Sequence, residues 1–259
     1  MRPTIYAPFM SLMAVAACSS SYSPSGALPP PPTHTNYTAQ GDSATIAGQL
    51  DAFRAALGGS LNAPNTPPAS GGRREINWDG VAAALTNVDT FPGTFFNVNS
   101  KRGAVLRTAG TGLRVDSTAF VSDNAGLGDQ FKSFSPKKLF MAVGSNEAEV
   151  GFELAGTTTS GLVNGFGVVF SDVDRAGSTR VDYFDESGAR LASVEAPARS
   201  GAHEYSFVGV VFASPIVARV VIISGEAALS PTITDLSAGG TKDLVVMDDF
   251  VYGEPQPLQ

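Results

Sequence analysis

The chain of 259 residues has few of the side chains that form cross-links, bind zinc or catalyse hydrolysis. It has one cysteine, Cys18, so no disulfide bond can form within it. Its two histidines, His34 and His203, are too few for a zinc site built from Cys and His ligands. The sequence also has no Gly-x-Ser-x-Gly elbow and no His-Glu-x-x-His helix. These absences disfavour a nucleophilic hydrolase and a zinc enzyme, and we expect a protein that is not an enzyme.

Basic residues are also in the minority. Seventeen Lys and Arg stand against 24 Asp and Glu, which gives a formal net charge of -7. A nucleic-acid-binding surface needs many cations to contact phosphates, so we expect no nucleic-acid partner. No segment approaches the roughly 20 apolar residues of a membrane-spanning helix.

The N-terminal segment has the features of an export signal. Arg2 precedes a short apolar stretch that ends in Val15-Ala16-Ala17-Cys18. This run resembles the lipobox of bacterial lipoproteins. The resemblance implies that residues 1–17 are a lipoprotein signal peptide and that Cys18 is lipidated, which anchors an exported chain to a membrane. In such lipoproteins an Asp directly after the cysteine disfavours sorting to the outer membrane. This chain has Ser19 at that position, so the same resemblance implies the outer membrane. The alternative is an ordinary cleaved signal peptide.

Three short segments follow before the main domain. Residues 18–42 are rich in Ser, Pro and Thr and are predicted to be a disordered tether. Residues 43–57 are predicted to form one amphipathic helix, because four apolar side chains recur at helical spacing and Gly58-Gly59 follows. These four are Ile46, Leu50, Phe53 and Leu57. Residues 58–72 are rich in Gly, Pro and Asn and are predicted to be a linker.

Residues 73–255 have the pattern of an all-β domain. Short runs rich in Val, Phe, Ile and Thr alternate with turn residues, and their number predicts a single antiparallel β-sandwich of jelly-roll-like form. Several runs are apolar on both faces, so one face needs a cover, and docking of helix 43–57 would provide it. The predicted strands are 95–99, 104–108, 112–116, 139–143, 149–154, 166–172, 180–185, 190–195, 205–212, 218–224 and 244–252.

Aspartates are the remaining candidates for a site. Asp172 and Asp174 are two residues apart, which places them on one side of an extended chain. Asp248 and Asp249 lie among apolar residues of the last strand, so one of them should point inward. Asp79, near the first strand, could approach them, since first and last strands are often neighbours. Oxygen ligands of this kind suit a structural Ca²⁺, although such aspartates often only cap turns.

Four segments carry a resemblance to known proteins: Arg74–Val81, Phe166–Asp174, Val181–Asp185 with Gly188, and Val246–Pro255. Together they resemble a group of uncharacterised exported bacterial proteins, over most of residues 73–255. More remotely, the closing Met-Asp-Asp-Phe strand is similar to the last strand of jelly-roll carbohydrate-binding modules. That similarity implies a structural calcium held by Asp248 or Asp249, and glycan binding on exposed aromatic rings.

Three functions stay open at this point. The favoured one is a membrane-anchored, non-catalytic binding module for a glycan or another envelope component. The alternative is a structural or assembly protein that packs against an envelope protein. The least favoured is an enzyme that uses a pair of carboxylates, a geometry that the sequence does not show.

Overall fold

The computed structural model describes Met1, residues 32–199 and residues 204–258. The predicted signal peptide, the lipidation site Cys18 and most of the predicted tether lie outside the described residues, as does His203. Residues from Pro32 onward make up one structural unit, and the description that follows concerns this unit alone.

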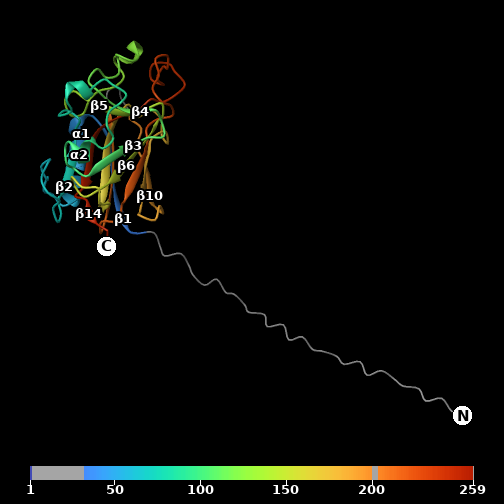
Figure 1. Cartoon of the computed structure of the whole chain (residues 1–259). Coiled ribbons are helices and arrows are strands. Elements are labelled where there is room, and N and C mark those ends of the chain that lie inside the picture. The colour runs from blue at the N-terminus through green and yellow to red at the C-terminus, as the bar shows by residue number, and fades with distance from the viewer. Residues whose placement is uncertain (2–31, 200–203, 259) are drawn as a thin grey trace. The chain divides into compact units, whose positions relative to one another are not determined.

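Two antiparallel sheets form the body of the unit (Figure 1). The larger sheet has the order β1-β11-β8-β13-β5-β4, with β2 also paired to β13, and the smaller has the order β10-β9-β12-β6-β3. The predicted all-β sandwich is therefore confirmed. The strands are β1 His34–Gly41, β2 Arg73–Ile76, β3 Ala104–Arg107, β4 Gly112–Asp116, β5 Leu139–Val143, β6 Glu147–Phe152, β7 Gly161–Leu162, β8 Gly165–Ser171, β9 Arg180–Phe184, β10 Arg190–Glu195, β11 Tyr205–Phe212, β12 Arg219–Ile223, β13 Val246–Gly253 and β14 Gln256–Pro257.

The core lies between the two sheets, where alternate side chains of facing strands meet. Trp78 is at its centre, stacked on Phe140 with ring centroids 4.2 Å apart. The indole N–H of Trp78 donates to the carbonyl of Asp248 at 2.7 Å, so its one polar atom is satisfied inside the core. This bond links the segment after β2 to β13.

Helix α1, Ser43–Ala56, covers the outer face of the larger sheet. Asp42 caps its start by accepting from the amide of Thr45 at 2.8 Å. The Phe53 ring lies directly over Gly167 and Gly209, where an added Cβ would come within 2.7 Å of the ring. The glycines therefore leave room for the ring, and the predicted docking of this helix is confirmed by its buried contacts with Val169, Phe207 and Val251.

Two local predictions are wrong. Residues 34–41, expected in the tether, form β1, which pairs with β11 along its whole length. The reason is local alternation: Tyr37 and Ala39 pack under α1 while their neighbours face outward. Residues 95–99, expected as a strand, contain the one-turn helix α2, Phe95–Val98. The turn lets Phe96 and the half-buried Phe95 both pack on the aromatic cluster around Trp78.

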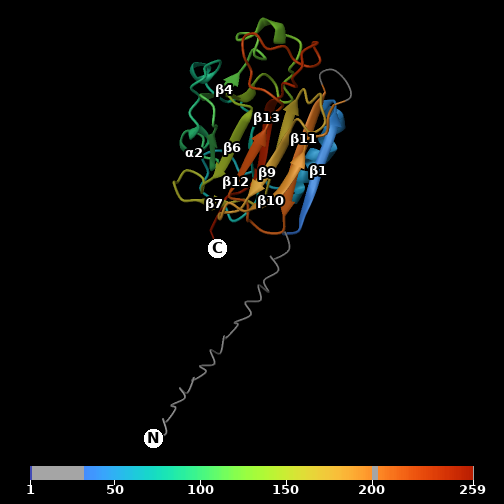
Figure 2. The same ribbon diagram turned by 90° about the vertical axis from the view of Figure 1, so that its right-hand side faces the viewer.

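The strand register divides the sandwich into two ends. At the end that we call the loop end, Tyr205 is level with Gly41 and with Ser171, which in turn faces Val246. The connections 172–179 and 224–245 leave from there, and Figure 2 shows the long loops gathered at that end. At the opposite end, which we call the terminus end, lie His34, the start of β1, and the C-terminal strand β14.

Candidate functional site

Four aspartates meet at the loop end, and we call them the carboxylate cluster: Asp172, Asp174, Asp235 and Asp243. Asp172 directly follows β8, and Asp174 lies two residues further on. Asp235 and Asp243 belong to the long connection between β12 and β13. The cluster therefore joins segments that are 60 or more residues apart in the chain.

Three members of the cluster have the spacing of metal ligands. One carboxylate oxygen each from Asp172, Asp174 and Asp235 lie within 4.8 Å of one another. Asp172 is 1% exposed, and Asp235 and Asp243 are fully buried. The sequence predicted that Asp172 and Asp174 lie on one side of an extended chain. The structure brings them together where β8 has ended, with Asp172 in a left-handed conformation at φ 75°.

Backbone amides hold two of these carboxylates in place. Asp243 accepts from the amides of Asp174 at 3.2 Å and Arg175 at 3.0 Å, and from the hydroxyl of Ser178 at 2.5 Å. Asp235 accepts from the amide of Leu244 at 2.8 Å. Because the bonds to Asp243 run between the two connections, they fix the connections against each other, whereas the bond to Asp235 lies within the connection between β12 and β13.

Asp172 is in a different situation. Neither of its oxygens accepts a hydrogen bond, although Nη2 of Arg199 contacts Oδ1 as an ion pair and also lies 2.6 Å from Oδ1 of Asp174. Burial raises the pKa of Asp172 to about 8, against the opposing effect of Arg199. Burial, followed by a side-chain contact with Asp235, also raises the pKa of Asp174. Asp172 and Asp174 thus share one guanidinium.

The other predicted aspartates do not form a comparable set. β2 pairs with β13, so the first and last strands of the predicted sandwich are neighbours as expected. Asp79, however, lies beside Lys138 and does not combine with Asp248 and Asp249 into a group of three ligands among the described residues. The expected calcium site at this junction therefore lacks the necessary geometry.

Asp248 and Asp249 interact with each other instead. The pairing of β13 with β8 shifts between Met247 and Phe250, a bulge that brings the two adjacent carboxyl groups into contact. Asp248 accepts from the amide of Phe134 at 2.5 Å and from the hydroxyl of Ser135 at 3.0 Å. Burial, with the neighbouring charge of Asp249, raises the pKa of Asp248 to about 9. Burial therefore favours the protonated form of Asp248.

An open groove at the loop end carries free cations, and we call it the lysine groove. The groove has a volume of about 650 Å³. Three of the five lysines of the sequence line it. Lys132 and Lys137 are exposed and take part in none of the salt bridges among the described residues. Lys138 donates to the carbonyls of Asp79 and Val81 and so anchors the groove wall. The lining residues are Ser117, Thr118, Ala119, Phe131, Lys132, Ser133, Lys137, Lys138 and Leu139.

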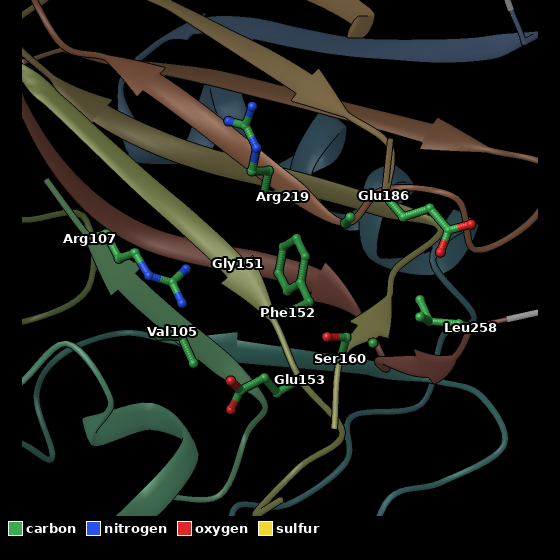
Figure 3. Close-up of a pocket in the computed structure, with 11 residues that line it drawn as sticks. Val105, Arg107, Gly151, Phe152, Glu153, Ser160, Glu186, Arg219 and Leu258 are labelled. Carbon is green, nitrogen blue, oxygen red and sulfur yellow. The ribbon is translucent and has the colours of Figure 1, made fainter. Parts of the chain in front are cut away.

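A second concavity, of about 350 Å³, lies on the outer face of the smaller sheet (Figure 3). Arg107 of β3 and Arg219 of β12, the strands on either side of β6, line it, and Glu186 lies across the groove. Both arginines pair with Glu149, at 3.3 and 3.2 Å, and Arg219 also stacks over Phe184 at 4.1 Å. Because its cations are already paired, this groove has less capacity to bind an anion than the lysine groove.

Exposed aromatic rings are scarce on the described surface. The large apolar side chains that are exposed there include no Phe, Tyr or Trp. Trp78, the only tryptophan, is 1% exposed. Phe152, which lines the concavity on the smaller sheet, packs on Phe166 and Tyr252 in the core. The described residues therefore provide no flat aromatic platform on which a sugar ring could stack.

Sequence reasoning missed Asp235, Asp243, Arg199 and the lysine groove. Asp235 accepts from the amide of Ser237, two residues on, at 2.7 Å, a local turn that its Asp-Leu-Ser context suggests. Nothing local, however, indicates that Asp235 meets Asp172. The clustering of lysines within residues 132–138 is visible in the sequence and was the one usable signal for the groove.

Comparisons with known proteins assign no family. No protein-family model matches the chain, and no curated protein matches it. A solved structure with weak similarity is the enzymatically active domain of bacteriophage CBA120 tailspike protein 4, at 14% identity and a TM-score of 0.19. The match covers 55% of this chain and 21% of the tailspike chain. The class that the coordinates define is an antiparallel β-sandwich with one docked helix.

Within the described residues, every helix is too short or too polar to cross a bilayer.

Proposed function

We propose that this protein is an exported, lipid-anchored, non-catalytic binding module that recognises an acidic glycan of the cell envelope in the lysine groove. The observation that carries the proposal is the pair of exposed lysines, Lys132 and Lys137, which form no salt bridge among the described residues and line an open groove of about 650 Å³ at the loop end. Binding residues are commonly held on loops by a rigid scaffold, and the sandwich is that scaffold.

The position of the groove supports display from a membrane. The described chain enters the sandwich through β1, whose first residue, His34, is at the terminus end. Lys132 is at the loop end, because its amide donates to the hydroxyl of Ser171 at 3.0 Å. The start of the described chain and the groove are therefore at opposite ends of the sandwich.

The chemistry of the surface favours an acidic ligand over a neutral one. Neutral sugars bind β-sandwich modules by stacking on aromatic rings, and the described surface exposes none of large area. Two unpaired ammonium groups with the hydroxyls of Ser117, Thr118 and Ser133 suit carboxylated or phosphorylated sugars instead.

The alternative function, a structural or assembly protein that packs against an envelope protein, was suggested by strands that are apolar on both faces. In the structure, α1 covers the outer apolar face of β8 and β11, with Phe53 fully buried there. This apolar face thus has its partner within the same chain, which leaves the binding module as the function with more support.

A binding assay with matched variants tests the proposal. We expect the protein to bind acidic polysaccharide and not a neutral polysaccharide of similar length, with an affinity that falls as salt is raised. The double substitution Lys132→Gln and Lys137→Gln should weaken binding by about tenfold or more, because each exposed ion contact contributes up to about 1 kcal/mol.

The matched control is the double substitution Lys101→Gln and Lys242→Gln, which makes the same change in net charge outside the groove. An equal loss of binding in both double variants would refute the lysine groove as the site. Equal binding of neutral and acidic polysaccharides would refute the ligand class. Mass spectrometry of the mature N-terminal peptide tests the anchor separately, and an unmodified Cys18 would contradict it.

A further inference from the structure

We propose that the carboxylate cluster binds one calcium ion, with Asp172, Asp174 and Asp235 as direct ligands and Asp243 as the residue that positions their loop. The cluster is separate from the lysine groove, and the inference does not depend on the proposed function.

The spacing of the three ligands fits calcium. Oxygen ligands lie about 2.3–2.6 Å from a bound Ca²⁺, so two ligands on opposite sides of the ion are about 5 Å apart at most. The three carboxylate oxygens all lie within 4.8 Å of one another. These distances are compatible with one ion that bridges all three side chains. The donor set is oxygen alone, which selects hard cations.

The state of Asp172 is an independent indication that a ligand belongs there. Its side chain is 1% exposed and faces the other cluster members, yet neither oxygen accepts a hydrogen bond. Buried carboxylates are costly unless they are hydrogen-bonded, paired or bound to a metal. The single contact from Arg199 reaches Oδ1 and must also serve Asp174.

The charge of the cluster leads to the same conclusion. The guanidinium of Arg199 pairs with Asp172 and Asp174, and the nearby Arg175 is occupied by Glu226, at 2.6 Å. The carboxylate oxygens of Asp172, Asp174 and Asp235 lie within 4.8 Å of one another, so their negative charges repel one another. A divalent cation between them would reduce the net negative charge.

A bound ion would cross-link the loop end. The connection 224–245 contains no helix and no strand of its own, and its Asp235 and Asp243 meet Asp172 and Asp174 from the connection after β8. Ser237 on the same connection also donates to Gln130 at 2.6 Å. In a chain without disulfide bonds, one ion would thus fix segments that are far apart in sequence.

Calorimetric titration of calcium into the full folded protein tests the inference directly. We expect one ion per chain, and a melting temperature about 5–10 °C higher at a calcium concentration 100 times the dissociation constant than in EDTA. Asp172→Asn and Asp235→Asn should each weaken calcium binding at least tenfold. Asp248→Asn, which changes a buried aspartate outside the cluster, should retain the calcium response.

The contrary results are specific. No heat and no change in melting temperature with calcium in the millimolar range would overturn the site, as would loss of the response in Asp248→Asn with retention in Asp235→Asn. A magnesium response as strong as that with calcium would overturn the assignment of the ion. If an Asn variant fails to fold, the titration of the unsubstituted protein still decides whether the ion binds. Polysaccharide binding is not used in any of these measurements, so the outcome is distinguishable from failure of the proposed function.

Discussion

The two groups of buried aspartates solve the same problem in different ways. Asp248 and Asp249 lie in the bulge of β13, where amides and a hydroxyl from the segment around Phe134 donate to Asp248 and burial raises the pKa of Asp248 to about 9. In the carboxylate cluster at the loop end the guanidinium of Arg199 pairs with Asp172 and Asp174, and Asp172 accepts no hydrogen bond. A buried acid is thus stable as a neutral, hydrogen-bonded group within a sheet, whereas several acids that converge from loops need added positive charge.

Removal of the guanidinium is the most severe test of this contrast. We expect Arg199→Gln to lower the free energy of unfolding in EDTA by about 3–5 kcal/mol, because it leaves buried carboxylates without their cation. Calcium should restore much of the loss. Urea unfolding with EDTA and with calcium measures both effects.

Arg107→Gln is the matched control for this measurement. Arg107 forms an ion pair with Glu149, and the side chain of Arg107 is largely exposed. Removal of this guanidinium should therefore lower the free energy of unfolding by less than about 1 kcal/mol. A loss of similar size for the two arginines, or no rescue of Arg199→Gln by calcium, would contradict the contrast between the two groups.

The raised pKa of Asp248 makes stability depend on pH. Burial raises the folded-state pKa of Asp248 to about 9 from its usual value of 3.8. Between these values the folded protein holds a proton that the unfolded chain has released, so the free energy of unfolding should fall as pH rises, by up to about 1.4 kcal/mol per pH unit.

Asp248→Asn should flatten this dependence, because an amide supplies the donated hydrogen at every pH and still accepts from Phe134. Asp248→Ala should instead destabilise the fold by about 1–3 kcal/mol at pH 5, since it leaves the amide of Phe134 without an acceptor. Denaturant unfolding from pH 5 to pH 9, at constant calcium, compares the three proteins. Parallel pH curves for Asp248→Asn and the unsubstituted protein would show that the pair holds no proton.

The smallest effect is expected at Asp79. This residue lies beside Lys138 and outside the group of three ligands, so Asp79→Asn should change both the melting temperature and the calcium response very little. A lost calcium response in Asp79→Asn would move the ion back to the junction of β2 and β13 and would remove the distinction between the two groups.

The sequence was sufficient where structure follows from local periodicity. Apolar and β-branched runs between turn residues located β5, β10 and β11 to the residue, and helical spacing from Ile46 to Leu57 located α1 together with its buried face. β1 was missed because the proline-rich residues before it dominate the composition of that region. α2 was missed because the adjacent Phe95 and Phe96 have the residue types of a strand.

The candidate site was harder to predict from the sequence, because it is formed by contacts between residues that are far apart in the chain. Asp172 and Asp174 could be singled out from a two-residue spacing, but Asp235 and Asp243 join them only through the folding of the connection between β12 and β13. The bulge at Asp248 and Asp249 likewise depends on the register of β13 with β8. The rule that neighbouring strand residues face opposite ways does not apply within such a bulge.

The most direct measurement is a count of calcium ions bound per chain by native mass spectrometry, on the protein and on its Asp235→Asn and Asp248→Asn variants. We predict one ion on the unsubstituted protein, one on Asp248→Asn and none on Asp235→Asn at the same free calcium concentration. No bound ion on any of the three, or one on Asp235→Asn and none on Asp248→Asn, would contradict the assignment.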